Sequence, residues 1–417
     1  MRQLRPPAVY VTQRAAADAR CVARMERMLT RIDAPRVREI TDEELAQLIQ
    51  DDGWDGSRRL SGNERTRDSP IVFNRFRWDD IDETGKATVS MPGPGHGQFY
   101  GFGPWSRRSR SGNRNTNNIV CQSAYELHTI RGCLFSCQYC YFEYVTNIML
   151  DIEEFADRTM ALAARLPQTL HKYDSHSDIL AFEPEYGASA MLTEAFGRQD
   201  RAYLMHYTKS NNVDCLIGAK HNGMSIVCWT LSSHTVSREV ERDTATMEER
   251  IEAGRRCQED GYHVRFRFSP VFPIKGWREE YTECLELLLG KVRPDVISIL
   301  ALSRLPDCDM IPRLFDVDLI DPRFLAAAEA ARDEVGGKLY GPLPHAAREE
   351  IYRFMIDEIR RISPDTPVST CLETPEMWNA LGDEMRMADD DYVCCCGPMS
   401  TPGEPRLCTS SPFNTAT

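Results

Sequence analysis

The feature that most constrains the fold is an alternation of short apolar runs with longer amphipathic segments between residues 121 and 305. Runs rich in β-branched and aromatic residues predict strands, and apolar residues at helical spacing predict helices. The runs are YELHTI, DILAFE, AYLMHYT, SIVCWTL, YHVRFRF and VISILAL, and the clearest helical segments are EEFADRTMALAARL, TMEERIEAGRRCQEDG and EEYTECLELLLGK. Strand–helix units at this spacing predict a parallel sheet, either a barrel or an open doubly wound sheet, with ligands at the carboxyl ends of the strands.

The flanking regions differ from this core. Residues 1–50 predict a small α/β domain, in which TDEELAQLIQDD is a helix that opens with Thr41 and Glu44 in the register of a capping box. Residues 51–120 are rich in Gly, Arg and Asn and predict a long loop or insert. Residues 306–417 predict a C-terminal part that ends in a cysteine-rich tail.

The insert contains four aromatic residues close to several arginines. Phe99, Tyr100, Phe102 and Trp105 precede an arginine-rich stretch. One hypothesis is a surface that stacks on bases and binds phosphates. The alternative, which we favour, is a solvated linker whose aromatic side chains dock on the body of the protein.

Charge, hydropathy and cysteine content narrow the class of protein. The net charge of −13 argues against attraction of nucleic acid by the whole surface. No run of about 18 apolar residues is present and the N-terminus lacks the apolar core of an export signal, so we expect a cytoplasmic location and no membrane partner. The 15 cysteines do not predict a disulfide framework, because their number is odd and no export signal is visible.

Three cysteines stand within eight residues, in the stretch RGCLFSCQYCYFEY. Cys133, Cys137 and Cys140 follow the first predicted strand of the core. Thiolates bind soft or borderline metals, and a structural zinc site normally takes four protein ligands. Three thiolates suit a [4Fe–4S] cube in which three irons each take one cysteine and the fourth iron stays open.

The CxxxCxxC spacing, with Tyr139 before the last cysteine, resembles the signature of radical S-adenosylmethionine enzymes. The segments TKSNNVD (208–214), HNGMSIVCWTLS (221–232), MEERIEAGRRCQEDGYHVRFRFSPVFPIKGW (247–277) and CLETPEMWNALG (371–382) resemble the spore photoproduct lyase family. The resemblance implies a partial (β/α)6-type barrel with a small N-terminal α/β domain and a C-terminal cap. It also implies that the open iron binds S-adenosylmethionine, which an electron from a donor such as flavodoxin or ferredoxin cleaves to a 5′-deoxyadenosyl radical.

The same resemblance assigns roles to five further residues. It places Lys209 near the carboxylate of the cofactor and Ser269 beside its adenosyl group. Thr230 keeps a hydroxyl contact where the family usually has serine, and Tyr139 packs near the adenine. Tyr141 matches a tyrosine thought to relay a hydrogen atom in the lyases.

The chain departs from the DNA-repair lyases at one position of the motif pattern. Those lyases carry a cysteine after the second barrel strand, which returns a hydrogen atom to the product. Here DILAFEPEYGASAM contains no cysteine, and Glu183 and Glu185 stand at the predicted strand end. We expect these two carboxylates to face the site and to be candidates for catalysis or for contacts with a polar substrate.

The tail YVCCCGPMSTPGEPRLC contains a second group of thiols. Cys394, Cys395 and Cys396 are candidate catalytic residues, and Cys394 and Cys396 with Cys408 are candidate ligands of a possible second iron–sulfur cluster. The other hypotheses are a site for a soft element, a thiol hydrogen donor over the barrel mouth, and a mobile tail without function.

Together these patterns predict a radical S-adenosylmethionine enzyme, of lyase or transferase type, that acts on an unidentified small polar substrate in preference to DNA. The first alternative is repair of a thymine dimer in DNA, as by the spore photoproduct lyases. A second is modification of a thiophilic element such as arsenic held by the C-terminal cysteines. The third is a metal–thiolate protein without enzymatic activity that binds nucleic acid.

Overall fold

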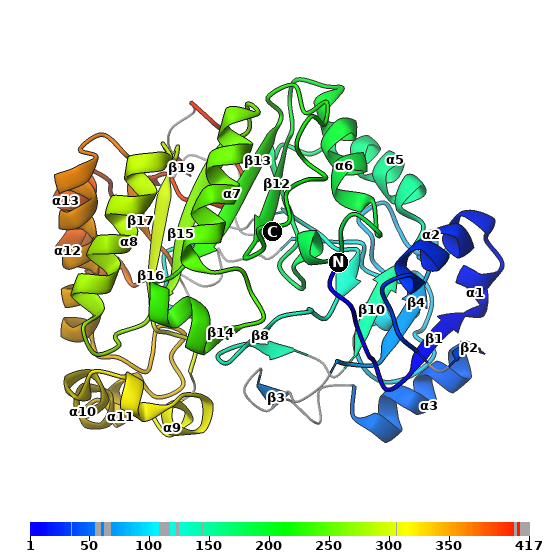
Figure 1. Ribbon diagram of the computed structural model, residues 1–417, viewed down its shortest axis with the longest axis horizontal. Helices are drawn as coiled ribbons and strands as arrows, with labels where there is room; N and C mark the ends of the chain where they lie inside the picture. Colours follow the sequence, from blue (N-terminus) through cyan, green and yellow to red (C-terminus); the bar gives the residue numbers. More distant parts are fainter. Residues whose placement is uncertain are drawn as a thin grey trace.

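The computed structural model describes residues 1–34, 36–54, 60–61, 68–107, 117–121, 125–142, 145–305, 307–403 and 407–408. Two sheets organise this part of the chain, a larger one in the middle of the sequence and a smaller one near the N-terminus. In Figure 1 the N-terminal sheet and its helices lie at one side of the molecule, and the helices of the C-terminal part lie at the other.

The larger sheet has eight strands in the order β17-β16-β15-β13-β12-β11-β6-β5. Neighbouring strands pair in parallel except for β5, which is antiparallel to β6. The strands are β17 (Val368–Thr370), β16 (Ile297–Ala301), β15 (His263–Val271), β13 (Ser225–Leu231), β12 (Tyr203–Thr208), β11 (Leu170–Tyr173), β6 (Tyr125–Leu127) and β5 (Trp105–Arg107). The described strands form no closed barrel, so the α/β class is confirmed while the six-unit partial barrel stays a prediction.

One face of this sheet is apolar and packs on helices. Phe266 of β15 approaches Gly254 so closely that a Cβ on the glycine would lie 2.7 Å from its ring, and Phe268 packs against Tyr281. Because side chains alternate along a strand, Arg265, Arg267 and Ser269 point to the other face.

The helices are α5 (Ile152–Ala163), α6 (Ala188–Gly197), α7 (Met247–Glu259), α8 (Trp277–Lys291), α9 (Met310–Leu314), α10 (Pro322–Ala330), α11 (Arg332–Val335), α12 (His345–Ile362) and α13 (Pro375–Met385).

The smaller sheet has the order β2-β1-β4-β10-β7 and draws strands from well beyond residue 50. Its strands are β2 (Val37–Ile40), β1 (Val9–Thr12), β4 (Ile71–Asn74), β10 (Thr146–Met149) and β7 (Ile130–Arg131), and its helices are α1 (Gln13–Ala16), α2 (Ala19–Leu29) and α3 (Asp42–Asp52). The predicted capping box is present on α3, where Thr41 and Glu44 satisfy each other's backbone amides. The three-cysteine loop lies between β7 and β10, so this sheet supports it from both ends.

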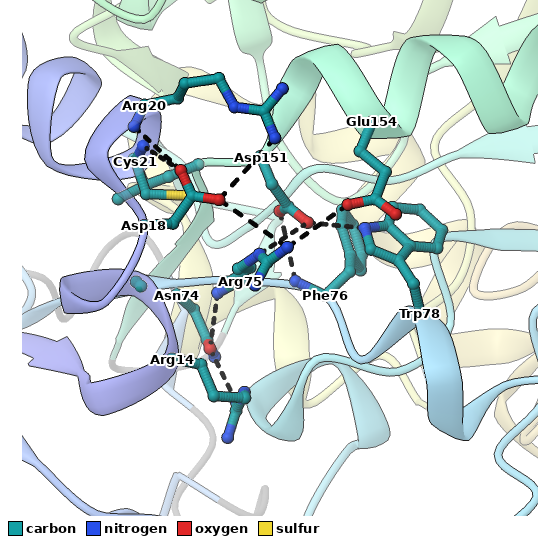
Figure 2. A network of polar contacts seen from close by, with 12 residues as sticks. Arg14, Asp18, Arg20, Cys21, Asn74, Arg75, Phe76, Trp78, Asp151 and Glu154 are labelled. Atoms are coloured by element: carbon teal, nitrogen blue, oxygen red, sulfur yellow. Dashed lines mark hydrogen bonds and ion pairs between the residues drawn. The ribbon is translucent and has the colours of Figure 1, made fainter.

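A polar network ties the strands of the smaller sheet to α5 (Figure 2). Arg75 lies 3.4 Å from a carboxylate oxygen of Glu154 and 3.8 Å from one of Asp151. Asp151 also accepts hydrogen bonds from the Phe76 amide at 3.2 Å and the Trp78 indole at 2.7 Å. Burial raises the pKa of Asp151 to about 6, in spite of these donors.

The aromatic residues of the insert are docked on the body of the protein. Phe99 and Tyr100 lie in η3 (Gly97–Tyr100) and are fully buried, and Phe102 and Trp105 are buried too. A stacking surface for bases is therefore not formed by these four side chains, and the docked interpretation holds. The arginine-rich residues 108–114 lie outside the described residues.

The cysteine-rich tail is docked against the larger sheet. The Thr169 and Leu170 amides donate to the Pro398 carbonyl at 3.0 and 3.1 Å, and Arg265 donates to the Cys395 carbonyl at 2.9 Å. Residues 393–401 thus cross the polar face of the sheet.

The remaining short elements are η2 (Trp78–Asp80), η4 (Ile179–Phe182), η5 (Val236–Val240), η6 (Val317–Leu319), and the pairs β3 (Leu60–Ser61) with β9 (Tyr141–Phe142), β8 (Ser136–Cys137) with β14 (Glu241–Arg242), and β18 (Asp391–Tyr392) with β19 (Leu407–Cys408).

Among the described helices, none combines the length and apolar character needed to cross a bilayer.

Candidate active site

A cavity of about 460 Å³ opens at the carboxyl ends of the parallel strands. This volume falls within the range of about 300–1,000 Å³ that is usual for small-molecule sites. Six cysteines line it: Cys121, Cys133, Cys137, Cys140, Cys371 and Cys396. Its charged and imidazole side chains are Glu126, Arg131, Lys172, His176, Asp178, Lys209, Arg267 and Arg304.

The loop that carries Cys133, Cys137 and Cys140 is held by backbone contacts on both sides. Strand β8, which contains Cys137, pairs antiparallel with β14, and the Gln138 amide donates to the Val240 carbonyl at 2.9 Å. Gly132 has φ +101°, and a Cβ there would lie 2.5 Å from the Val145 carbonyl oxygen. The loop therefore requires glycine at this position to turn its three thiols into the cavity.

A buried charged network stands behind the loop. Glu241 accepts hydrogen bonds from Tyr139, from Ser232 at 2.7 Å and from Arg250 at 2.6 Å. Burial alone raises the pKa of Glu241, but Arg250 and Lys209 outweigh it, so the pKa lies below the usual value and the carboxylate is ionised. The network fixes the Tyr139 ring on the cavity wall.

Lys209 follows the last residue of β12 and lines the cavity. Its ammonium stands 5.8 Å from the centre of the Tyr139 ring, and its amide donates to Asp178 at 2.6 Å. Burial lowers the pKa of Lys209, but the charges of Glu241 and Cys137 more than offset it, so the pKa is raised. The side chain is thus a fixed cation beside the three-cysteine loop.

Thr230 and Ser269 line the same cavity. Thr230 donates to the Tyr207 hydroxyl at 2.9 Å, and Arg267 donates to the same hydroxyl at 3.0 Å. The structure therefore brings Tyr139, Lys209, Thr230 and Ser269 together with the three cysteines.

Glu183 and Glu185 do not line this cavity, contrary to the expectation that they face the site. The run DILAFE is not a strand: its residues form η4, and the strand is β11, eight residues earlier. Glu183 accepts hydrogen bonds from the Gly187 and Ser189 amides at 2.6 and 2.7 Å, at the start of α6. Glu185 pairs with Arg31 at 2.8 Å, in the N-terminal unit. Both carboxylates therefore serve the fold.

The residues after β11 supply cavity groups that the sequence interpretation missed. Ser175, His176, Ser177 and Asp178 line the cavity where Glu183 and Glu185 were expected. Lys172 of β11 lies 3.5 Å from Glu126 of β6 and 4.4 Å from the Tyr207 ring centre. The available signal was the polar strand LHKY, whose charged residue faces the cavity.

A histidine pair extends this wall. His128 hydrogen-bonds to Asp174 at 2.8 Å and stacks on His176 with ring centres 4.1 Å apart. Ligand atoms of Glu126, His128 and His176 all lie within 4.8 Å of one another.

The tail cysteines divide into two kinds. Cys396 lines the cavity and its thiol hydrogen-bonds to that of Cys394. The Cys395 side chain points away from the cavity, and its sulfur lies 3.4 Å from the Phe266 carbonyl oxygen. Its amide donates a hydrogen bond to the Ser298 hydroxyl. Cys395 is therefore a core residue, which corrects its assignment as a catalytic candidate. The side chains of Tyr141 and Cys408 lie outside the described residues.

The fold and site define a class: an α/β protein whose three-thiol loop and fixed cation share one cavity at the strand ends. Comparison with known proteins agrees with this class. The model of the family described as spore photoproduct lyase matches residues 116–303. The spore photoproduct lyase of Bacillus subtilis is 27% identical over 223 residues, which cover 50% of this chain and 63% of that protein. The Clostridium acetobutylicum spore photoproduct lyase is 26% identical over 253 residues, 56% of this chain and 74% of that protein.

Solved structures show the same fold. A spore photoproduct lyase complexed with dinucleoside spore photoproduct superposes with a TM-score of 0.57 at 17% identity, covering 88% of this chain and 98% of that one. A mutant lyase with bound AdoMet and the same dinucleoside superposes with a TM-score of 0.55 at 16% identity, covering 88% of this chain and 99% of that one. The predicted resemblance to the spore photoproduct lyase family is confirmed. The chain spans less than two thirds of the first relative's length.

The preference for a small-molecule substrate over DNA is wrong. It is overturned by these relatives, whose solved structures include complexes with dinucleoside spore photoproduct. The physical reason lies in how charge is distributed. The chain carries a net charge of −13, but the cavity is lined by five Lys and Arg side chains and two carboxylates. The whole-chain charge therefore does not describe the charge that a ligand meets.

Proposed function

We propose that this protein is a radical S-adenosylmethionine enzyme, built on a partial (β/α)6-type barrel, that acts on a cross-linked dinucleoside unit of DNA of the spore photoproduct type. The observation that carries the proposal is the convergence of the three-cysteine loop and Lys209 on one cationic cavity. The family relationship supplies the substrate class. When bound, a [4Fe–4S] cluster and S-adenosylmethionine would supply an electron and a 5′-deoxyadenosyl radical.

The residues present fit these two groups. Cys133, Cys137 and Cys140 offer three thiols from one loop, which suits three irons of a cube and leaves one iron for the cofactor. Lys209 is a cation held beside that loop, where a charge-assisted hydrogen bond would bind the carboxylate of the cofactor. Tyr139, fixed by Glu241, closes the same wall.

The cations on the remaining cavity wall suit a nucleotide substrate. Arg131, Lys172, Arg267 and Arg304 line the cavity together with Lys209, and phosphate groups are neutralised by such side chains. The strand-end hydroxyls of Thr230 and Ser269 offer neutral hydrogen bonds to sugar or base edges. Tyr141 is proposed as the hydrogen-atom relay, since no cysteine stands between β11 and β12.

Incubation of the anaerobically reconstituted protein with reductant, S-adenosylmethionine and dinucleoside spore photoproduct tests the proposal. We expect release of 5′-deoxyadenosine and conversion of the photoproduct to two thymidine units, and we expect Tyr141→Phe to lower conversion more than cofactor cleavage. Release of 5′-deoxyadenosine without conversion would refute the substrate. No release at all would refute the enzyme class.

A further inference from the structure

A second group of thiols reaches the same cavity from three separate parts of the chain. Cys371 is the first residue after β17, Cys121 lies beside the bridge between Val120 and Glu373, and Cys394 and Cys396 belong to the tail. Cys121, Cys371 and Cys396 line the cavity, and Cys394 is hydrogen-bonded to Cys396. We call Cys121, Cys371, Cys394 and Cys396 the second thiol group.

Backbone hydrogen bonds hold the three segments next to strand β16. The Cys371 amide donates to the Ile299 carbonyl at 2.8 Å, and the Val120 amide to the Glu373 carbonyl at 2.7 Å. The tail is fixed by the Cys395 amide, which donates to Ser298 at 3.0 Å. Because Cys395 turns into the core, Cys394 and Cys396 are directed to the opposite side of the tail.

A buried cation faces this group without a carboxylate partner. Arg267 is 8% exposed, and its side-chain hydrogen bonds to described residues go to a thiol and a hydroxyl rather than to a carboxylate. It donates to the Cys371 sulfur at 3.0 Å and to the Tyr207 hydroxyl, while its Nε finds no hydrogen-bond partner among the described atoms. A buried guanidinium requires compensating negative charge, which thiolates bound to a metal centre would provide.

A buried hydroxyl also lies two residues before Cys394. Tyr392 is 3% exposed, and its hydroxyl has no hydrogen-bond partner in the described part of the chain. Two buried polar groups thus border the second thiol group with unmet hydrogen-bonding capacity.

We propose that the second thiol group binds a second iron–sulfur cluster, a [4Fe–4S] centre with one cysteine on each iron. Four thiolates would leave no iron open to S-adenosylmethionine. A single zinc ion requires sulfurs only about 3.8 Å apart, given a Zn–S bond of about 2.3 Å in tetrahedral geometry. Among the described residues, no three cysteine sulfurs lie within 4.8 Å of one another, in this group or in Cys133, Cys137 and Cys140.

The proposal revises the cluster expected from the sequence. Cys394 and Cys396 keep their role as ligands, and Cys121 and Cys371 join them from distant positions. It does not depend on the substrate of the enzyme.

Iron and acid-labile sulfide in the anaerobically reconstituted full chain test the proposal. We expect about eight irons in the wild type, about four in the Cys133→Ala/Cys137→Ala/Cys140→Ala variant and about four in Cys371→Ala/Cys396→Ala. Cys215→Ala is the matched control, because Cys215 is half-buried and packs on the core away from the cavity. It should keep about eight.

A second variant guards against loss of iron through misfolding. Arg267→Met removes no ligand but removes the facing cation, and should lower the iron content toward four while thermal unfolding stays cooperative. About four irons in the wild type, with none in the three-cysteine variant, would overturn the second cluster while leaving the proposed reaction intact. Zinc in place of iron, lost with Cys371 and Cys396, would equally overturn it. Failure of the proposed function shows instead as iron retained without 5′-deoxyadenosine.

Discussion

Two thiol groups share one cavity, and they are built in different ways. Cys133, Cys137 and Cys140 come from a single loop, clamped between β7 and β10 and paired through β8 to β14. The second thiol group is assembled from three segments that meet only beside β16. A local loop can hold a cluster with one open iron, whereas an assembled group couples metal binding to the packing of the C-terminal part.

The cations beside the two thiol groups also differ, one suiting a ligand that exchanges and the other a metal centre that stays bound. Lys209 is an ammonium just after a strand end, next to the first group, and is suited to pair with the carboxylate of a ligand that binds and leaves. Arg267 is a buried guanidinium that donates a hydrogen bond to the Cys371 sulfur of the second group, and it is suited to balance a permanent negative charge. The comparison indicates a reactive centre on one side and a resident centre on the other.

The largest expected effect follows from removing one thiol of the first group. Cys137→Ala should lower 5′-deoxyadenosine release by about 1,000-fold or more and iron content by about four, because the open cube loses a ligand. Release is measured by chromatography after reduction, with Cys215→Ala as control. If Cys137→Ala released 5′-deoxyadenosine at the wild-type rate, the first thiol group would not hold the reactive cluster.

The next effect concerns the buried pair behind the first group. Glu241→Gln leaves Arg250 charged and buried, so the free energy of unfolding should fall by about 3–5 kcal/mol. Urea denaturation measures the change. Glu252→Gln on the exposed face of α7 should leave the denaturation midpoint nearly unchanged, since its pair with Arg255 is solvated. Equal shifts in both variants would contradict the structural role of Glu241.

Asp151 lies outside both thiol groups, so it shows the effect of burying a carboxyl group where no metal is proposed. Its pKa is raised from 3.8 to about 6 by burial, so the folded protein holds a proton that the unfolded chain has lost. The stabilisation is present in full below about pH 4 and is lost as pH rises through about 6, a change of about 3 kcal/mol.

Asp151→Asn should remove that dependence. Urea denaturation of both proteins between pH 4 and 7 gives the difference in slope, in which other titrating groups cancel. Parallel curves for the wild type and Asp151→Asn would show that the Asp151 carboxyl titrates normally.

The smallest expected effect concerns the cation of the first group. Lys209→Met should weaken binding of S-adenosylmethionine by about 10- to 100-fold, which corresponds to a lost charge-assisted hydrogen bond of about 1.5–3 kcal/mol. Equilibrium binding to the reconstituted protein measures this, and Lys209→Arg should recover part of the loss. Unaltered affinity in Lys209→Met would separate Lys209 from the cofactor.

The difference between the two groups also explains what the sequence could reveal. CxxxCxxC is a local pattern, so Cys133, Cys137 and Cys140 were predictable as one site. Cys121 and Cys371 are 250 residues apart in the chain, and only the strand pairing beside β16 brings them to the tail.

The misplaced strand has a similar cause. DILAFE is apolar because η4 is buried, and a short apolar run does not distinguish a strand from another buried segment. The true strand, LHKY, contains Lys172 because its inner face borders a polar cavity, and this broke the apolar pattern. Glu183 and Glu185 were therefore assigned to the site through the wrong strand end.

The most direct test of the account is electron paramagnetic resonance of reduced protein with and without S-adenosylmethionine. In the wild type, the cofactor should alter the signal of one cluster. In the Cys133→Ala/Cys137→Ala/Cys140→Ala variant, the remaining cluster signal should not change and no 5′-deoxyadenosine should form. A cofactor-dependent change in that variant would contradict the assignment of the open iron to the three-cysteine loop.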